Sequence, residues 1–167
     1  IMLNGTGLLG NASSKQSAII VKKPGSSSLY YIFTTWDAIR FSIVDMSLNG
    51  GLGAITSKNT QIQKGWREYV HILKGDNLDE YGIVYDLAGS RNIYAHRFSE
   101  SGFDLNPVVS PIIESQDIHW EFLGNSNVAI IKGVDYNDSY IRFYTFNRTI
   151  GVLELLKKSI NIDYIIR

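Results

Sequence analysis

The chain has 167 residues, carries 16 Lys and Arg against 16 Asp and Glu, and contains no Cys. The balanced charge argues against a nucleic-acid binder, which normally shows a basic excess, and the missing Cys excludes disulfides, thiolate metal sites and cysteine nucleophiles. Because no apolar run reaches the roughly 18 residues of a bilayer span, we expect no membrane insertion.

Short runs of aromatic and β-branched residues dominate the chain and indicate β-strands. In chain order, we predict strands over 17–22, 29–35, 41–47, 69–73, 81–88, 93–98, 108–113, 128–132 and 140–146. Residues 153–160 fit either one or two helical turns or a further strand. The connections are short and rich in turn residues, which favours antiparallel hairpins over a parallel sheet with crossover helices.

Some of these strands are apolar on both faces. In residues 29–33, Leu29, Tyr31 and Phe33 alternate with two further apolar residues, and 128–131 is an unbroken apolar run. Such strands are covered on both sides. A stack of small sheets covers both sides of a strand, whereas a sandwich covers one face of each sheet.

Three segments repeat a pattern of an aromatic strand, a turn with Gly and a β-branched strand. Aligning Met46 with Phe98 and Phe146 gives offsets of 52 and 48 residues. Two further strands precede each anchor and one follows it. Four strands in about 40–50 residues is the period of β-propeller blades.

The sequence therefore predicts an all-β fold, a partial β-propeller of about three four-stranded antiparallel blades over 17–63, 64–114 and 117–160. Residues 1–16 would belong to the end of a preceding blade or its connection, and 163–167 would open the next blade. Propellers typically have four to eight blades, so missing blades of the same chain or another copy would complete the ring. Because the chain opens without a signal peptide, we expect an excerpt from a longer protein. The alternative fold is a β-sandwich.

Four stretches near the start carry a recognisable pattern: residues 4–10 (NGTGLLG), 16–21 (QSAIIV), 31–34 (YIFT) and 42–53 (SIVDMSLNGGLG). They resemble the N-terminal WD-repeat-like propeller of large exported bacterial surface proteins, which often carry PKD-type domains and a gliding-motility-associated C-terminal domain. The resemblance is close over about 2–60. It is looser over 61–167, where the blade rhythm and 106–110 (NPVVS) recur and the usual Ser-Pro-Asp-Gly turn is absent from the third repeat.

This resemblance implies a secreted or cell-surface location and a non-catalytic adhesion or scaffold role, and it offers no catalytic residues. We therefore expect a binding module whose blade loops contact a protein or glycan ligand. Two alternatives remain open. One is an enzyme or metal site in the channel of the complete propeller, and the other is self-assembly through exposed blade faces.

Two histidines are candidates for lining such a channel. His71 and His119 lie 48 residues apart and would occupy equivalent positions on the first strands of adjacent blades. Two imidazoles can contribute to a metal or anion site. No carboxylate or third His recurs at the matching position, so we interpret the pair as channel-lining or packed side chains.

Three tryptophans, Trp36, Trp66 and Trp120, are the candidates for ligand contact, because an exposed indole can stack on a sugar ring. Packing in the core or between blades is the alternative.

Other motifs do not point to chemistry. Residues 5–10 match G-x-G-x-x-G but lack the strand and helix that a dinucleotide site requires. The acidic loops 76–80 and 135–138 lack EF-hand spacing. No Gly-x-Ser-x-Gly motif is present. The sequence thus predicts no catalytic residue, metal or cofactor.

Overall fold

The computed structural model describes residues 1–14, 16–65, 70–73, 80–86, 92–111, 118–123, 127–135 and 138–161. Every regular element in these ranges is a β-strand, apart from one short 3-10 turn, η1 (Asn49–Gly51). The predicted all-β class is confirmed, and residues 153–160 lie in a strand rather than a helix. Within the same ranges, no helix is long and apolar enough to cross a bilayer.

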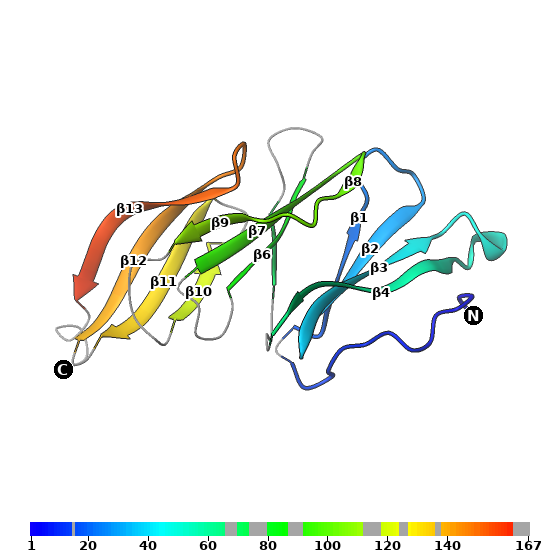
Figure 1. The fold of residues 1–167 in the computed structure, drawn as a ribbon, viewed down its shortest axis with the longest axis horizontal. Helices are drawn as coiled ribbons and strands as arrows, with labels where there is room; N and C mark the ends of the chain where they lie inside the picture. The colour runs from blue at the N-terminus through cyan, green and yellow to red at the C-terminus, as the bar shows by residue number, and fades with distance from the viewer. Residues whose placement is uncertain are drawn as a thin grey trace. The chain divides into compact units, whose positions relative to one another are not determined.

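Three antiparallel sheets are built from successive stretches of the chain (Figure 1). The first contains β1 (Ala18–Lys22), β2 (Leu29–Thr34), β3 (Ala38–Asp45) and β4 (Ala54–Lys64). The second contains β5 (His71–Leu73), β6 (Glu80–Asp86), β7 (Asn92–Ser99) and β8 (Gly102–Phe103), with β9 (Val108–Pro111) also paired to β7. The third contains β10 (Ile118–Phe122), β11 (Val128–Asp135), β12 (Asp138–Asn147) and β13 (Val152–Asn161).

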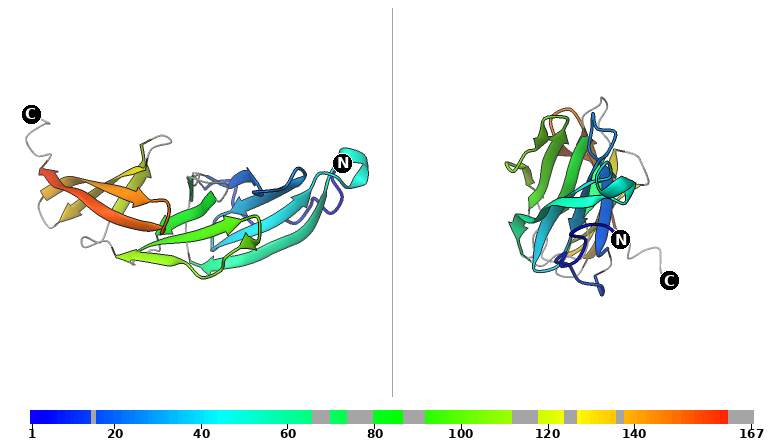
Figure 2. Two further views of the ribbon diagram at one scale, coloured as in Figure 1. Left: turned by 90° about the horizontal axis from the view of Figure 1, so that it is seen from above. Right: turned by 90° about the vertical axis from the view of Figure 1, so that its right-hand side faces the viewer.

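The order of strands within each sheet largely follows their order in the chain, since hairpins connect neighbours. In the first sheet, Phe33 of β2 lies opposite Phe41 of β3. The third sheet shows the same consecutive pairing, and Figure 2 shows its β12–β13 hairpin, coloured orange to red, from above. Local hairpin pairing of this kind is what the short turn-rich connections predict.

The chain divides into two compact units, Ile1–Val70 with Phe98–Leu105 and His71–Arg97 with Asn106–Arg167. The boundary falls inside β7, so the first unit holds the first sheet and the β7–β8 turn, and the second unit holds the third sheet and most of the second.

Alternation along β2 gives the first sheet two buried faces. We call them the Phe33 face and the Ile32 face. The Phe33 face carries Tyr31, Phe33 and Phe41, and the Ile32 face carries Ile32, Val44 and Ile55. All six side chains are at most 8% exposed, as expected of strands that are apolar on both sides.

The Phe33 face packs against the β7–β8 hairpin. Phe98 lies 5.5 Å from the Tyr31 ring centroid and 6.0 Å from that of Phe33. Phe103 lies 5.0 Å from Phe41, measured between the same points. These centroid distances are those of favourable tilted aromatic pairs, so the cluster forms the core of the first unit.

The Ile32 face is covered by residues 2–9, which we call the N-terminal arm. Its side chains Met2 and Leu8 pack against this face. The arm runs beside β4 (dark blue in Figure 1), and Leu3 pairs with that strand in parallel through both its N–H and its C=O group. The arm therefore also covers part of an edge strand that would otherwise expose unpaired backbone groups.

The second unit has its own core between the second and third sheets. Its buried cluster combines residues of β5, β7, β11, β12 and β13: Leu73, Ile93, Ala95, Ala129, Tyr144, Phe146 and Leu153. The Ser110 hydroxyl of β9 accepts a 2.9 Å hydrogen bond from the backbone N–H of Leu153 in β13. Apolar contact and one buried hydrogen bond thus join two successive sheets.

Candidate functional site

The turn between β2 and β3 presents Trp36, the one tryptophan whose side chain lies in the described part of the chain. Its residue is 38% exposed, and its backbone N–H donates to the Ala38 carbonyl at 3.2 Å. The turn is braced on both sides, because the Thr35 hydroxyl donates to the Gln16 carbonyl at 2.9 Å. The Asp37 carbonyl accepts from the N–H of Gly65, also at 2.9 Å. The backbone of this turn is therefore held by hydrogen bonds, while Trp36 itself is partly exposed to solvent.

The residue that follows Trp36 in the same turn carries a fixed carboxylate. The two Asp37 oxygens accept hydrogen bonds of 2.8 and 3.0 Å from the two terminal nitrogens of Arg40. Arg40 is only 8% exposed, whereas the Asp37 side chain is 58% exposed. The bidentate geometry holds the carboxylate in one orientation.

The ion pair also fixes the charge of the carboxylate. Hydrogen bonding and charge from Arg40 hold the pKa of Asp37 below its usual value, and the same hydrogen bond raises the pKa of Arg40. Asp37 is therefore ionised at neutral pH, and its exposed oxygens can still accept hydrogen bonds from a ligand.

A turn that carries an exposed indole and an oriented carboxylate on successive residues has the groups needed to bind a ligand. The ring can stack on an apolar ligand face, and the carboxylate can accept hydrogen bonds from hydroxyl or amide groups. Within the described ranges, no group of three His, Asp or Glu residues could hold a metal ion.

The other two candidate tryptophans are Trp66 and Trp120. Trp66 lies outside the described residues. Trp120 lies in β10, where its backbone pairs with Ile131, but its side chain lies outside the described part. The role of both residues as ligand contacts stays a prediction.

The two candidate histidines lie on β5 and β10, the first strands of the second and third sheets. The half-buried His71 ring meets Phe122 edge to face, with centroids 5.5 Å apart. His119 pairs through its backbone with Lys132, and its side chain lies outside the described part. The described contact of His71 is therefore an aromatic packing contact, and a joint site with His119 stays a prediction.

The glycine-rich motif at residues 5–10 overlaps the end of the N-terminal arm and extends one residue beyond it. No helix follows it, because residues 11–14 form a turn in which the Ser14 N–H donates to the Asn11 carbonyl at 3.1 Å. The helix N-terminus that would bind a phosphate is missing from this place.

Sequence reasoning missed two polar pairs. Asp37 and Arg40 are three residues apart across a turn, a spacing that suggests an ion pair. Tyr85 and His96 form a buried hydrogen bond of 2.9 Å between β6 and β7, and their separation of 11 residues across a predicted hairpin was the available signal.

Comparisons with protein-family models, with curated proteins and with solved structures found no match to this chain. The function must therefore be argued from the chemistry of the chain itself.

Proposed function

We propose that the chain is part of a β-propeller and serves as a non-catalytic binding and scaffolding module of an exported bacterial protein. The propeller is supported by the repeat of about fifty residues and by three successive antiparallel sheets, each made from one stretch of chain. Blades of a propeller have this construction. Export and surface display are proposed from the resemblance of the N-terminal third to exported bacterial surface proteins.

The observation that carries the binding function is a single turn in which the exposed Trp36 is followed by Asp37, whose carboxylate is fixed by Arg40. Loops on a rigid sheet scaffold commonly carry binding residues. A sugar ring presents an apolar face together with hydroxyl donors, which matches an indole face and a carboxylate acceptor. We therefore favour a glycan over a peptide as the ligand of this turn.

The test is binding of the purified, fluorescently labelled chain to glycan and peptide arrays. We expect Trp36→Ala to weaken glycan binding roughly tenfold or more, since aromatic anchors dominate binding free energy. Trp36→Phe should retain part of the affinity. Leu123→Ala, at another exposed apolar residue (44% exposed), is the matched control and should bind as the wild type does.

Unchanged glycan binding by Trp36→Ala would remove this turn from the proposed site. Trp36-dependent binding to peptides alone would keep the module function and replace the ligand class. Export has a separate test, protease treatment of intact cells that produce the native protein. Cleavage only after cell lysis would contradict surface display.

A further inference from the structure

Among the described residues, two contacts between successive sheets have the same polarity, meaning that each joins equivalent faces of the two sheets in the same order. In the first unit, the face of the first sheet that carries Phe33 and Phe41 packs on Phe98 and Phe103. In the second unit, the face of the second sheet that carries Ile93 packs on the third-sheet face that carries Phe146. In the repeat alignment, Phe41 corresponds to Ile93, and Phe98 corresponds to Phe146. Each contact therefore joins the same two kinds of face.

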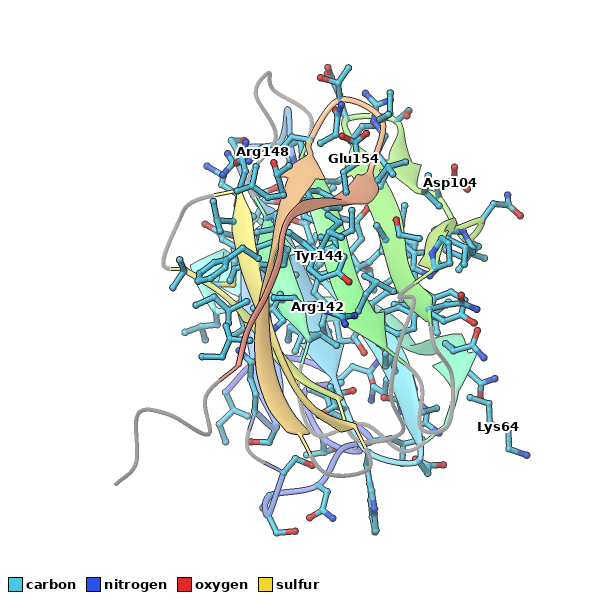
Figure 3. The ribbon with its side chains drawn as sticks, turned by 90° about the vertical axis from the view of Figure 1, so that its left-hand side faces the viewer. Lys64, Asp104, Arg142, Tyr144, Arg148 and Glu154 are labelled. Atoms are coloured by element: carbon cyan, nitrogen blue, oxygen red, sulfur yellow. The ribbon has the colours of Figure 1, made fainter. Side chains whose placement is uncertain are left out.

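By this correspondence, the Ile32 face of the first sheet is the face on which a preceding sheet would pack. Val44 pairs with Ile55 across β3 and β4, just as Tyr144 pairs with Leu155 across β12 and β13. Tyr144 (labelled in Figure 3) lies on the third-sheet face that receives the second sheet. The Ile32 face is therefore the first sheet's receiving face, and no sheet packs on it within the described residues. The N-terminal arm packs there instead.

The complementary face belongs to the third sheet. By alternation along β12, Ile141 and Phe143 point away from Tyr144, and they correspond to Phe41 and Ile43 of the first sheet. Phe143 lies opposite Ile130 of β11. The side chains of Ile130, Ile141 and Phe143 on this face are only half-buried.

We propose that the Ile32 face is a docking surface for the Ile141–Phe143 face of a second copy of this chain, and that the N-terminal arm holds this surface closed. The contact would repeat the polarity of the two contacts inside the chain. It is heterologous, so it joins different surfaces of the two copies and builds a ring or a chain of copies. Two copies would bring six sheets together, within the usual range of four to eight propeller blades. The proposal does not depend on a ligand at Trp36.

The arm is suited to reversible closure because polar side chains at the surface hold much of it. The Asn59 side chain donates to the Gly7 carbonyl at 2.9 Å and accepts from the Leu9 N–H at 3.0 Å. The Lys58 ammonium donates to the Asn4 side-chain oxygen at 2.8 Å. All three bonds are exposed, where water competes and the net gain per bond is small.

The experiment uses the full chain and changes only the arm. Met2→Asp with Leu8→Asp places two charges against the Ile32 face and should detach the arm. Leu9→Asp is the matched control, because the Leu9 residue is 51% exposed. Mass is measured by size-exclusion chromatography with light scattering at tens of micromolar, since association depends on concentration. Near-UV circular dichroism verifies the aromatic core.

We expect the wild type and Leu9→Asp to have the monomer mass of 18.8 kDa, and the double variant to have at least twice that mass. Adding Phe143→Asp to the double variant should restore the monomer, because it places a charge on the complementary face. A second variant, Lys58→Ala with Asn59→Gly, removes the arm's surface bonds without charging the apolar face. This second variant should also raise the measured mass above that of the monomer. It replaces the first variant in the test if the first does not fold.

A natively folded arm variant that stays monomeric would overturn the proposal. So would an oligomer that Phe143→Asp does not dissociate, because a different surface would then mediate association. Neither result would change glycan binding through Trp36, so failure of this proposal is distinguishable from failure of the proposed function.

Discussion

The Tyr85 hydroxyl and the His96 Nε2 atom share a hydrogen bond of 2.9 Å in the interior of the second sheet. Both residues are at most 1% exposed, and their rings stack with centroids 5.7 Å apart. Tyr94 stacks on the Tyr85 ring as well, at 5.5 Å. The hydrogen bond offsets part of the cost of removing two polar groups from water, so the pair specifies how β6 and β7 lie against each other.

Tyr85→Phe removes this hydrogen bond while keeping the ring. We expect the free energy of unfolding to fall by about 1–2 kcal/mol, the usual effect of losing a buried hydrogen bond. Tyr31→Phe is the matched control, since Tyr31 is 2% exposed and its hydroxyl makes no hydrogen bond to the residues that the structure describes. Urea unfolding measures both. Equal losses in the two variants would contradict a specific role for the bond.

The ionisation of Tyr85 should make the protein less stable in alkali. Burial, and to a smaller extent Tyr94, raises the pKa of Tyr85 well above its usual value. The unfolded chain releases this proton at about pH 10, whereas the folded chain retains it. The stabilisation is therefore complete below about pH 10 and is lost as the pH rises further.

Urea unfolding at a series of pH values between neutrality and strong alkali tests this expectation. The free energy of unfolding should decline more steeply above pH 10 for the wild type than for Tyr85→Phe. Tyr31 contributes a slope of the same sign in both proteins, because burial raises its pKa too. If the free energy of unfolding falls in parallel for the two proteins, Tyr85 has the same pKa in the folded and the unfolded chain.

Much of the fold was predictable because strand alternation is a local signal. Tyr31 and Phe33 on one side of β2 and Ile32 on the other predict a strand covered on both faces, and all three are buried. What covers the Ile32 face was not predictable. Residues 4–10 read as a glycine-rich loop, and the contacts that hold them, such as Asn59 with Gly7, join residues 52 apart without any periodic pattern.

The candidate site shows a similar division. Residue type alone makes Trp36 a candidate for ligand contact, and the structure shows that this residue is 38% exposed. The Asp37 carboxylate is not predictable as part of the site, because the sequence alone does not say that Arg40 is buried and turns both terminal nitrogens to Asp37. The orientation of a side chain depends on such tertiary contacts, which composition and spacing do not carry.

Gly25 occupies the β1–β2 turn with a φ of +69°, and a Cβ atom there would lie 2.6 Å from Cγ of Glu100. We expect Gly25→Ala to lower the free energy of unfolding by about 1–2 kcal/mol, mainly through the left-handed backbone. Gly50→Ala is the control for backbone strain alone, because Gly50 has a φ of +63° and a Cβ atom added there would meet no atom within 4 Å.

A double-mutant cycle separates the two causes. In a Glu100→Ala background, Gly25→Ala should cost as much as Gly50→Ala does, since the crowding side chain is gone. Thermal or urea unfolding gives the four values. A cost of Gly25→Ala that is the same with and without the Glu100 side chain would mean that this side chain simply moves aside.

Ser110 provides the hydrogen bond that joins the second and third sheets. Its hydroxyl accepts from the Leu153 N–H at 2.9 Å, and the two residues are 2% and 7% exposed. Ser110→Ala should leave that N–H at the start of β13 without this acceptor and cost about 1–3 kcal/mol, the penalty for an unsatisfied buried group. Ser101→Ala, which removes an exposed hydroxyl bonded to Ser99, should change stability by less than about 0.5 kcal/mol.

Hydrogen exchange locates the effect of Ser110→Ala. We expect the Leu153 amide to lose protection far more than the amides of β2 and β3, because those lie in the first sheet, in the other compact unit. A uniform loss of protection across all three sheets would mean that Ser110 acts on global unfolding. A local loss at β13 would identify this hydrogen bond as the link that keeps the third sheet docked on the second.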